Sequence, residues 1–435
     1  MRRTIIVVLD GLRRDMISAE HTPHLMAFAE QAERFSGYRS VFPSATRVVS
    51  ATLATGCYPS RHELQGNSLA LLEDGALVPH DAGHPEFLQH KRRVTGRSLA
   101  VPTLAERLKD AGGAIVFNNV SPGAAYAHDP DGFGFVYHRA GSFGPDRTQP
   151  GRLLLPETEQ LHVTLDTDGD RRMTERFVSE ALRKRRPALA VLWLGEPDHI
   201  QHNAPLGSPQ HLAALSEADR HAGLVISAVN RMSDEGDDPL LIVASDHGHQ
   251  TVSGVVDIDS ELIDAGLKAN ADSGDVLAIS NGTSALVYVH PDHERIVPSL
   301  HDFLQSRAWA GEVVDAASLC TVGQAPRHGL AFAVSLKSDD TPNAYGIRGS
   351  SLVAKPSSGK SDRLGCGQHG GLAAYEQSPF LMIDGAGFQS GVERSDPVAV
   401  VDIAPTVLRH LGVQADGMDG QPLQRTIPER MEIRP

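Results

Sequence analysis

Five short apolar segments, separated by stretches with a helical pattern, constrain the fold more than any other feature of the sequence. These segments are 5–9, 114–117, 189–194, 240–244 and 379–383, and they lack the polar alternation of a half-exposed strand. Continuous apolar runs of this length are typical of strands buried on both faces. We therefore predict an α/β fold, with a doubly wound and mainly parallel sheet sandwiched between layers of helices.

The helical patterns lie at 22–35, 102–111, 174–184, 208–232 and 397–411. Ser208 and Pro209 give the fourth of these a favourable N-cap and first position. Residues 252–366 interrupt the alternation, because the runs 285–289 and 330–334 favour antiparallel strands around a helix over 294–305. We predict one core domain formed by residues 1–251 and 367–435, with residues 252–366 inserted as an α+β cap.

Two other stretches carry few apolar runs. Residues 68–98 and 118–170 are rich in Gly, Pro, His and Asp. Loops of such length are usually functional or inserted. We expect both stretches to be loops that take part in selecting the ligand.

The charge of the chain limits its partners. The formal net charge is −14, from 54 acidic and 40 basic residues, so we expect neither a nucleic-acid polymer nor an anionic membrane as a partner. A small anionic substrate remains compatible, because bound divalent cations can reverse the local potential. The three cysteines show no CxxC spacing, and the first apolar run is too short for a signal peptide or a membrane span. We therefore expect a cytoplasmic protein, and a homodimer is left open.

Side chains that bind metals follow three of the predicted strands. They are Asp10 after the first strand, Asp198 and His202 after the third, and Asp246 and His247 after the fourth, while His369 precedes the last strand. Ligand sites of open α/β sheets lie beyond the carboxyl ends of the strands. Any one of these residues is more simply a helix cap or a surface loop residue, but four separate clusters favour a metal site. Mixed carboxylate and imidazole ligands favour Zn²⁺ over Mg²⁺ or Ca²⁺.

Several motifs resemble those of one enzyme superfamily. They are Val8-Leu9-Asp10-Gly11, Phe42-Pro43-Ser44-Ala45-Thr46, Thr55-Gly56-Cys57-Tyr58-Pro59, Glu196-Pro197-Asp198 with His202, Ser245-Asp246-His247-Gly248 and Gln368-His369-Gly370. In this order they resemble the alkaline phosphatase superfamily, and within it the branch of nucleotide pyrophosphatase/phosphodiesterase-like and phosphonoacetate hydrolase-like enzymes. The resemblance implies an alkaline phosphatase-like catalytic core.

The resemblance also implies two bound Zn²⁺ ions, with Mn²⁺ as an alternative metal. One ion would be held by Asp198, His202 and His369, and the other by Asp10, Asp246, His247 and the nucleophile Thr46. Two such cations can stabilise the attacking and the leaving side of a displacement at phosphorus. Thr46 would form a phosphothreonine intermediate, which water then hydrolyses.

The residues near Thr46 leave some assignments open. Thr46 could instead be a helix N-cap, since a helical pattern follows it. Nucleotide phosphodiesterases usually carry an Asn after the nucleophile that donates to a phosphate oxygen, and here Arg47, Ser50 or Asn67 could take that part. Phosphonoacetate hydrolases carry lysines that hold the substrate carboxylate, whereas the stretch 118–123 has none.

We expect a small phosphodiester as the substrate. No arginine lies between Asp198 and His202 or beside His369 to balance the second charge of a monoester. The near alternative is a phosphonate hydrolase. Cys57 stands in a Cys-x-Pro-Ser-Arg run that is typical of sulfatases, but it follows Thr55-Gly56 directly, so we interpret it as a structural thiol. A sulfatase, a phosphomutase and a non-catalytic binding protein are less favoured.

Overall fold

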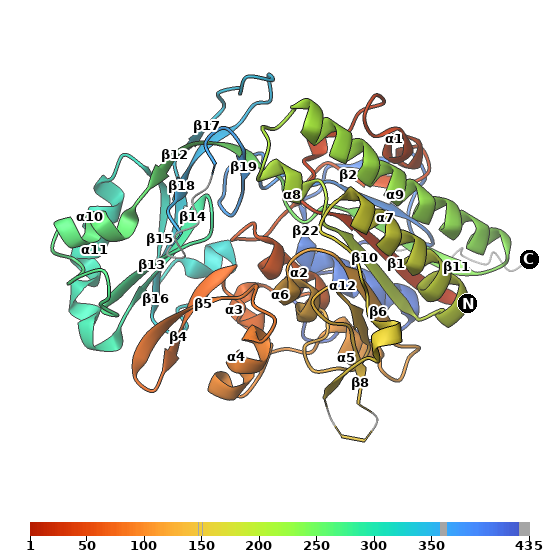
Figure 1. Cartoon of the computed structure of the whole chain (residues 1–435), viewed down its shortest axis with the longest axis horizontal. Coiled ribbons are helices and arrows are strands. Elements are labelled where there is room, and N and C mark those ends of the chain that lie inside the picture. The colour runs from red at the N-terminus through yellow and green to blue at the C-terminus, as the bar shows by residue number, and fades with distance from the viewer. Residues whose placement is uncertain (147, 150, 357–362, 426–435) are drawn as a thin grey trace, which may run out of the picture.

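The computed structural model describes residues 1–146, 148–149, 151–356 and 363–425 (Figure 1). Residues 357–362 of the predicted cap and 426–435 of the predicted core lie outside the described residues. A ten-stranded sheet crosses the larger part of the molecule. Its strands, in spatial order, are β21 (Glu393–Arg394), β2 (Glu33–Phe35), β20 (Leu381–Asp384), β11 (Asp238–Ala244), β1 (Arg2–Leu9), β10 (Leu189–Leu194), β6 (Ala114–Asn118), β7 (Phe135–Tyr137), β8 (Phe143–Pro145) and β9 (Arg152–Leu154).

All five predicted apolar segments lie in this sheet. β11, β1, β10, β6 and β7 are parallel neighbours, whereas β20 pairs antiparallel with β11. Along β1, Ile6 and Val8 face one hydrophobic cluster, and Ile5, Val7 and Leu9 face another. Strands buried on both faces explain why these runs are continuously apolar. The predicted α/β sandwich is therefore confirmed.

Helices cover both faces of the sheet (Figure 1). One layer contributes α1 (Pro23–Ala29), α7 (Thr167–Arg176), the π-helix Phe177–Arg185 and α9 (Pro209–Asp234). The other contributes α2 (Thr46–Thr55), α5 (Leu104–Leu108), α6 (Pro122–Ala127) and α12 (Ile403–Leu411). α9 begins as predicted, because the Ser208 side chain accepts a hydrogen bond from the His211 N–H and Pro209 is its first residue.

Strand pairing shortens two of the predicted helices. The pattern at 22–35 is wrong in its second half, where Glu33–Phe35 pairs with β20 and β21 as strand β2. The pattern at 397–411 becomes a helix only from Ile403, because strand β22 (Val398–Ala399) pairs with β3 (Tyr38–Arg39). In both places tertiary strand pairing overrides local helical periodicity.

Neither stretch is the loop that we expected: 118–170 contains α6 and the strands β7, β8 and β9, and 68–98 is also regular. The stretch 68–98 forms a hairpin of β4 (Ser68–Glu73) and β5 (Ala76–Asp81), followed by α4 (Phe87–Thr95). The two turn residues, Asp74 and Gly75, both have positive φ angles, of 47° and 85°. An Asp-Gly pair is a strong hairpin signal, since such turns match the twist of the flanking strands. The sequence therefore contained a signal for this hairpin.

Most of the described residues of the region 252–366 form a lobe at the left of Figure 1. One sheet comprises β13 (Val276–Ser280), β14 (Ser284–Val289), β16 (Leu330–Leu336) and β15 (Ala310–Asp315), and a second comprises β17 (Ser338–Asp339), β18 (Ser350–Ala354), β12 (Gln250–Val256) and β19 (Gly367–Gln368). Helices α10 (Ile258–Asp264) and α11 (Val297–Ser306) pack against these strands, and together they form a hydrophobic cluster within the lobe. The predicted strands β14 and β16 are antiparallel, as expected.

Within the described residues, no helix has both the length and the apolar character needed to cross a membrane.

Candidate active site

Three adjacent parallel strands place the Asp and His side chains that could bind metals at one edge of the sheet. β1 lies between β10 and β11, so the residues that follow these strands meet. Asp10 follows β1, and its carbonyl oxygen accepts a hydrogen bond of 3.1 Å from the Asp198 N–H. Asp198 begins the short helix α8 (Asp198–Gln201), and Asp246 follows β11. The parallel topology thus assembles the site.

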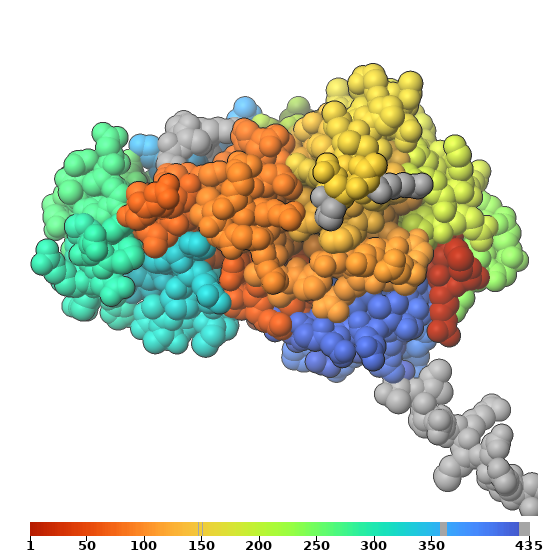
Figure 2. All heavy atoms as spheres, turned by 90° about the horizontal axis from the view of Figure 1, so that it is seen from below, coloured from red at the N-terminus to blue at the C-terminus, as the bar shows by residue number. Residues whose placement is uncertain are grey.

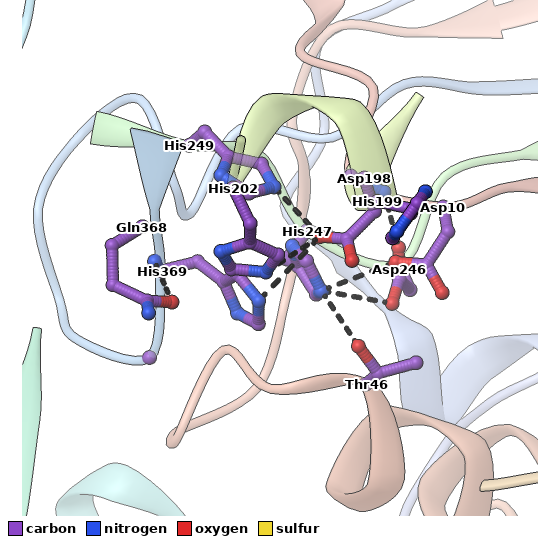
Figure 3. A network of polar contacts seen from close by, with 12 residues as sticks. Asp10, Thr46, Asp198, His199, His202, Asp246, His247, His249, Gln368 and His369 are labelled. Atoms are coloured by element: carbon purple, nitrogen blue, oxygen red, sulfur yellow. Dashed lines mark hydrogen bonds and ion pairs between the residues drawn. The ribbon is translucent and has the colours of Figure 1, made fainter. Parts of the chain in front are cut away.

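Four side chains form what we call the imidazole-rich half of the site: Asp198, His202, His249 and His369 (Figure 3). Asp198 Oδ1 lies 2.8 Å from Nε2 of His249. The same oxygen lies 3.4 Å from His202 Nε2 and 3.6 Å from His369 Nε2. One ligand atom from each residue lies within 4.8 Å of the others, close enough to bind a single cation.

A second group forms the carboxylate-rich half: Asp10, Thr46, Asp246 and His247 (Figure 3). His247 Nε2 lies 3.1 Å from Thr46 Oγ1 and 3.1 Å from Asp246 Oδ2. It also lies 3.4 Å from Asp10 Oδ1. Its ring stacks on that of His369, with 3.6 Å between the ring centroids, so the two halves are in direct contact.

Hydrogen bonds from outside the cluster fix the orientation of these groups. His369 Nδ1 lies 2.7 Å from the carbonyl oxygen of Ser44, to which it can only donate, so Nε2 is left with a free lone pair. The Trp193 indole N–H donates to Asp10 Oδ2 at 2.7 Å. Such supporting contacts are characteristic of metal ligands, because they hold the tautomer and the ring position.

Gly11 permits the closest approach within the site. Its φ angle is +71°, and its N–H donates to Asp246 Oδ1 at 3.0 Å. A Cβ atom at this position would lie 2.7 Å from His249 Nε2. A side chain would therefore be disfavoured both by the backbone conformation and by collision with the imidazole.

The buried carboxylates of the carboxylate-rich half lie close together and repel one another. Burial, followed by the charges of Asp246 and Asp198, raises the pKa of Asp10 well above its usual value. Asp10 Oδ1 and Asp246 Oδ2 are buried and accept no hydrogen bond of normal geometry, and both lie close to His247 Nε2. Buried carboxylates need a donor or a counter-ion, so these residues fit a bound divalent cation.

In the imidazole-rich half, lowered pKa values keep the imidazoles of His249 and His369 neutral, which is the form that binds metals. Burial lowers the pKa of His249 to about 3, and burial and the nearby His247 lower the pKa of His369 well below its usual value. For Asp198, burial opposes ionisation, but His202 and His249 hold its pKa well below the usual range. The carboxylate is therefore charged while these two imidazoles are neutral, which is the protonation state a metal requires.

Thr46 is the first residue of α2, and the structure contradicts its interpretation as a helix N-cap. Ala45 is the N-cap, and no side chain caps this end of the helix. The Thr46 hydroxyl instead faces His247, and the residue is 8% exposed. A helix N-terminus favours negative charge, so the backbone at Thr46 suits an anionic ligand.

A cavity of about 510 Å³ opens beside the imidazole-rich half. It is lined by Asn67, Ser68, Leu165, His199, His202, Asn203, Ser280, Asn281, Gly282, Pro356, Arg363, Gly367, Gln368 and His369. Both the core and the region 252–366 contribute to this lining. The cavity is large enough for a small organic ester.

Arg47 and Asn67, two of the three candidates for donating to a phosphate oxygen, are hydrogen-bonded to each other, but their side chains face different groups. The Arg47 N–H donates to Asn67 Oδ1 at 3.0 Å, which leaves Nδ2 as the donor end of the Asn67 amide. The Arg47 guanidinium donates to Ser121 Oγ and to the Asn67 carbonyl oxygen, and it lies 3.4 Å from Asp81. Arg47 therefore contacts the base of the β4–β5 hairpin.

Cys57 lies just beyond the C-terminal end of α2, where Gly56 is the C-cap. Its side chain is buried, and its thiol donates to the carbonyl oxygen of Gly417 at 3.6 Å. Burial and the charge of Asp419 raise the pKa of the thiol, which makes it a poor nucleophile at neutral pH. These properties fit the structural thiol that we expected.

The seven residues of the two predicted ligand sets lie together, and the structure adds an eighth, His249. His249 is not among the ligands that we predicted from the sequence. Two observations could have found it: it lies two residues after His247, and Gly248 between them allows a tight turn. A Cβ atom at Gly248 would lie 2.2 Å from the Tyr375 carbonyl oxygen. The site accordingly offers four groups in each half that could bind a metal ion.

Comparison with solved structures shows that the fold is shared over the whole chain. Murine ectonucleotide pyrophosphatase/phosphodiesterase 5, in an inactive form with AMP, matches with a TM-score of 0.68 and 17% identity over 97% of this chain and 98% of that one. Phosphonoacetate hydrolase from Sinorhizobium meliloti 1021, with phosphonoformate, matches with a TM-score of 0.66 and 16% identity over 95% of both chains. A search of curated protein sequences found no significant match.

Comparison with family models identifies the family of the chain, which a shared fold alone does not. The family model for type I phosphodiesterase / nucleotide pyrophosphatase matches residues 4–369. That match includes every residue of both halves of the site. The chain therefore belongs to the type I phosphodiesterase / nucleotide pyrophosphatase family, and with it to the phosphoester hydrolases of the alkaline phosphatase superfamily.

Proposed function

We propose that this protein is a dinuclear zinc hydrolase that cleaves a small phosphodiester through a phosphothreonine intermediate at Thr46. The observation that carries the proposal is the position of the Thr46 hydroxyl. It lies at the N-terminus of α2, 3.1 Å from His247 Nε2, within a cluster of buried carboxylates. A hydroxyl in this position combines a nucleophile with an environment built for cations.

The two halves would each hold one Zn²⁺ ion. Asp198, His202 and His369 would bind one, with His249 as an added candidate ligand, and Asp10, Asp246, His247 and Thr46 would bind the other. When bound, the ions would supply Lewis-acid stabilisation of the charges that develop on the attacking and the leaving oxygen atoms. Imidazole ligands favour zinc, and Mn²⁺ is the proposed substitute.

Thr46 Oγ1 would attack phosphorus, form a P–O bond and displace the leaving oxygen as an alcohol. His247 Nδ1 is turned towards the Gly248 carbonyl oxygen at 3.1 Å, so Nε2, the atom that would hold an ion, faces the Thr46 hydroxyl. The hydroxyl proton would pass to water, and the leaving oxygen would take a proton from water. Water would then hydrolyse the phosphothreonine and restore Thr46. The N-terminus of α2 would favour negative charge at Thr46 in both steps.

A relative supports this assignment. Murine ectonucleotide pyrophosphatase/phosphodiesterase 5 was solved with AMP bound, in an inactive form that carries a threonine-to-alanine substitution. An activity that depends on a threonine in a relative of the same fold agrees with a threonine nucleophile here. The AMP ligand of that protein also agrees with a phosphoester substrate.

Asn67 is the better candidate for the residue that donates to a non-bridging phosphate oxygen. Its Oδ1 already accepts the Arg47 N–H, so its Nδ2 can donate towards the cavity that Asn67 lines. Arg47 would serve chiefly to hold Asn67, because its guanidinium is engaged by Ser121 and the Asn67 carbonyl oxygen. One amide donor suits a substrate with one non-bridging negative charge.

The charges around the cavity favour a diester over a monoester. Arg363 is the one arginine among the described residues that line it, and its guanidinium donates to the Asn203 carbonyl oxygen. The second charge of a phosphate monoester would therefore meet little compensation. A phosphonate ester also carries one charge, and the likeness to phosphonoacetate hydrolase makes phosphonate hydrolysis the second candidate.

We further propose a cytoplasmic location. The three cysteines are free, and Cys57 and Cys366 are buried, which suits a reducing compartment. The homodimer stays a prediction.

Steady-state kinetics on four esters with one common nitrophenol leaving group would test the substrate class. We expect the highest kcat/KM on the phosphodiester, followed by the phosphonate monoester, with the phosphate monoester and the sulfate ester lower. A higher kcat/KM on the phosphate monoester would refute the order. A higher value on the sulfate ester would refute the phosphoester assignment itself.

A further inference from the structure

A second group of side chains that could bind a metal ion lies outside the active site, on the β4–β5 hairpin and helix α4. Glu73 is the last residue of β4, His80 lies in β5, and His90 lies in α4. Glu73 Oε1 lies 2.5 Å from His80 Nε2 and 2.9 Å from His90 Nε2. The ligand atoms of all three residues lie within 4.8 Å of one another. We call them the hairpin cluster.

Packing from two sides holds these side chains in place. The His80 and His90 rings are 4.8 Å apart between centroids, and the Phe87 ring lies 5.7 Å from that of His80. Partial burial opposes ionisation of Glu73, but hydrogen bonds from the two imidazoles lower its pKa. The cluster therefore presents a charged carboxylate and two imidazole nitrogens at one point.

The exposure of the cluster distinguishes it from a surface ion pair. The side chains of Glu73, His80 and His90 are 18%, 19% and 31% exposed. They are buried enough to be held in position, yet open enough for water to reach the point where they converge. A surface pair such as His162 with Glu157, at 65% and 85% exposure, has neither a second imidazole nor this confinement.

We propose that the hairpin cluster binds a divalent transition metal, with Zn²⁺ as the best match, through His80 Nε2, His90 Nε2 and Glu73 Oε1. Two imidazoles and one carboxylate form a zinc-type ligand set, whereas Mg²⁺ and Ca²⁺ prefer sets made of oxygen alone. Water from the exposed side would complete the tetrahedral coordination.

Such an ion would fasten the hairpin to helix α4 near the active site. The base of the hairpin carries Asn67 and Asp81, and both contact Arg47, the neighbour of Thr46. The hairpin segment lies at the molecular surface in Figure 2, next to the lobe formed by residues 252–366. The bound ion would stabilise this rim of the protein without touching the reacting atoms.

Metal content of the full-length protein tests the proposal. Wild type, the double variant His80→Gln/His90→Gln and the control His162→Gln would each be equilibrated with Zn²⁺, dialysed and analysed for zinc. We expect the double variant to retain one equivalent fewer than the wild type and the control to match the wild type. The metal ions of the active site are common to all three proteins, so their number does not affect the difference.

Two further measurements keep the result interpretable. Hydrolysis of a nitrophenyl phosphodiester reports whether the double variant is folded, and if it is not, Glu73→Gln replaces it in the same analysis. Co²⁺ added after the active site is saturated should give a d–d absorption band of a four-coordinate site in the wild type and the control but not in the double variant. Equal zinc content in the wild type and a folded variant would overturn the proposal, as would a Co²⁺ band that the variant retains.

Discussion

The two halves of the active site are built from the same residue types but have opposite electrostatics. In the carboxylate-rich half, Asp10 and Asp246 lie close together, and Asp10 has a raised pKa. In the imidazole-rich half, one ionised carboxylate, Asp198, is surrounded by three imidazoles. The first half brings together two buried carboxylates whose repulsion a cation would relieve, whereas the second carries a single ionised carboxylate among its imidazoles. We infer that the nucleophile lies in the half where a bound cation changes the local potential most.

The largest effect should come from removing the nucleophile in the carboxylate-rich half. Thr46→Ala should lower kcat by about 10³-fold or more, because no other hydroxyl would take over the displacement. Most of the bound zinc should remain, since seven other groups would still hold the two ions. Cys57→Ala is the matched control and should leave kcat unchanged. An active Thr46→Ala protein together with an inactive Cys57→Ala protein would move the nucleophile to Cys57.

A smaller effect is expected in the imidazole-rich half. His249→Gln should lower the affinity of the imidazole-rich half for its metal ion by about 10- to 100-fold, which is the usual effect of losing a group that supports a metal site. His249 Nε2 lies 2.8 Å from Asp198 Oδ1, so the change also frees the carboxylate that three imidazoles share. Zinc retention during titration with a chelator would measure it. Loss of both ions together would show that the two halves are not separable.

The pH dependence of the metal-free protein should show the opposite electrostatics directly. His249 has a folded pKa of about 3, below its unfolded value, so its contribution to stability is lost as pH falls below about 6.5. Asp10 has a folded pKa above its unfolded value, so its contribution favours the folded state at low pH and is lost as pH rises.

Urea unfolding of the chelated protein at several pH values would measure both contributions. His249→Gln should reduce the loss of stability on acidification, and Asp10→Asn should reduce the loss on going to higher pH. Identical pH profiles for the two variants would contradict the opposite character of the halves.

The sequence predicted the part of the site that depends on topology. Asp10, Asp198 and Asp246 follow apolar strands, and parallel strands bring their carboxyl ends to one edge of a sheet. The contacts of Arg47 could not be predicted, because Asn67, Asp81 and Ser121 are distant in sequence and meet it only through the hairpin. The helical pattern at 22–35 was misleading for a similar reason, since pairing with a distant strand decided its second half.

The stereochemical course at phosphorus tests the central claim most directly. A phosphorothioate diester with a chiral phosphorus atom would be hydrolysed in ¹⁸O-labelled water, and the configuration of the product determined. Attack by Thr46 followed by attack of water comprises two in-line displacements, each of which inverts phosphorus. The account therefore predicts net retention of configuration. Net inversion would show that water attacks the substrate directly and would contradict a phosphothreonine intermediate.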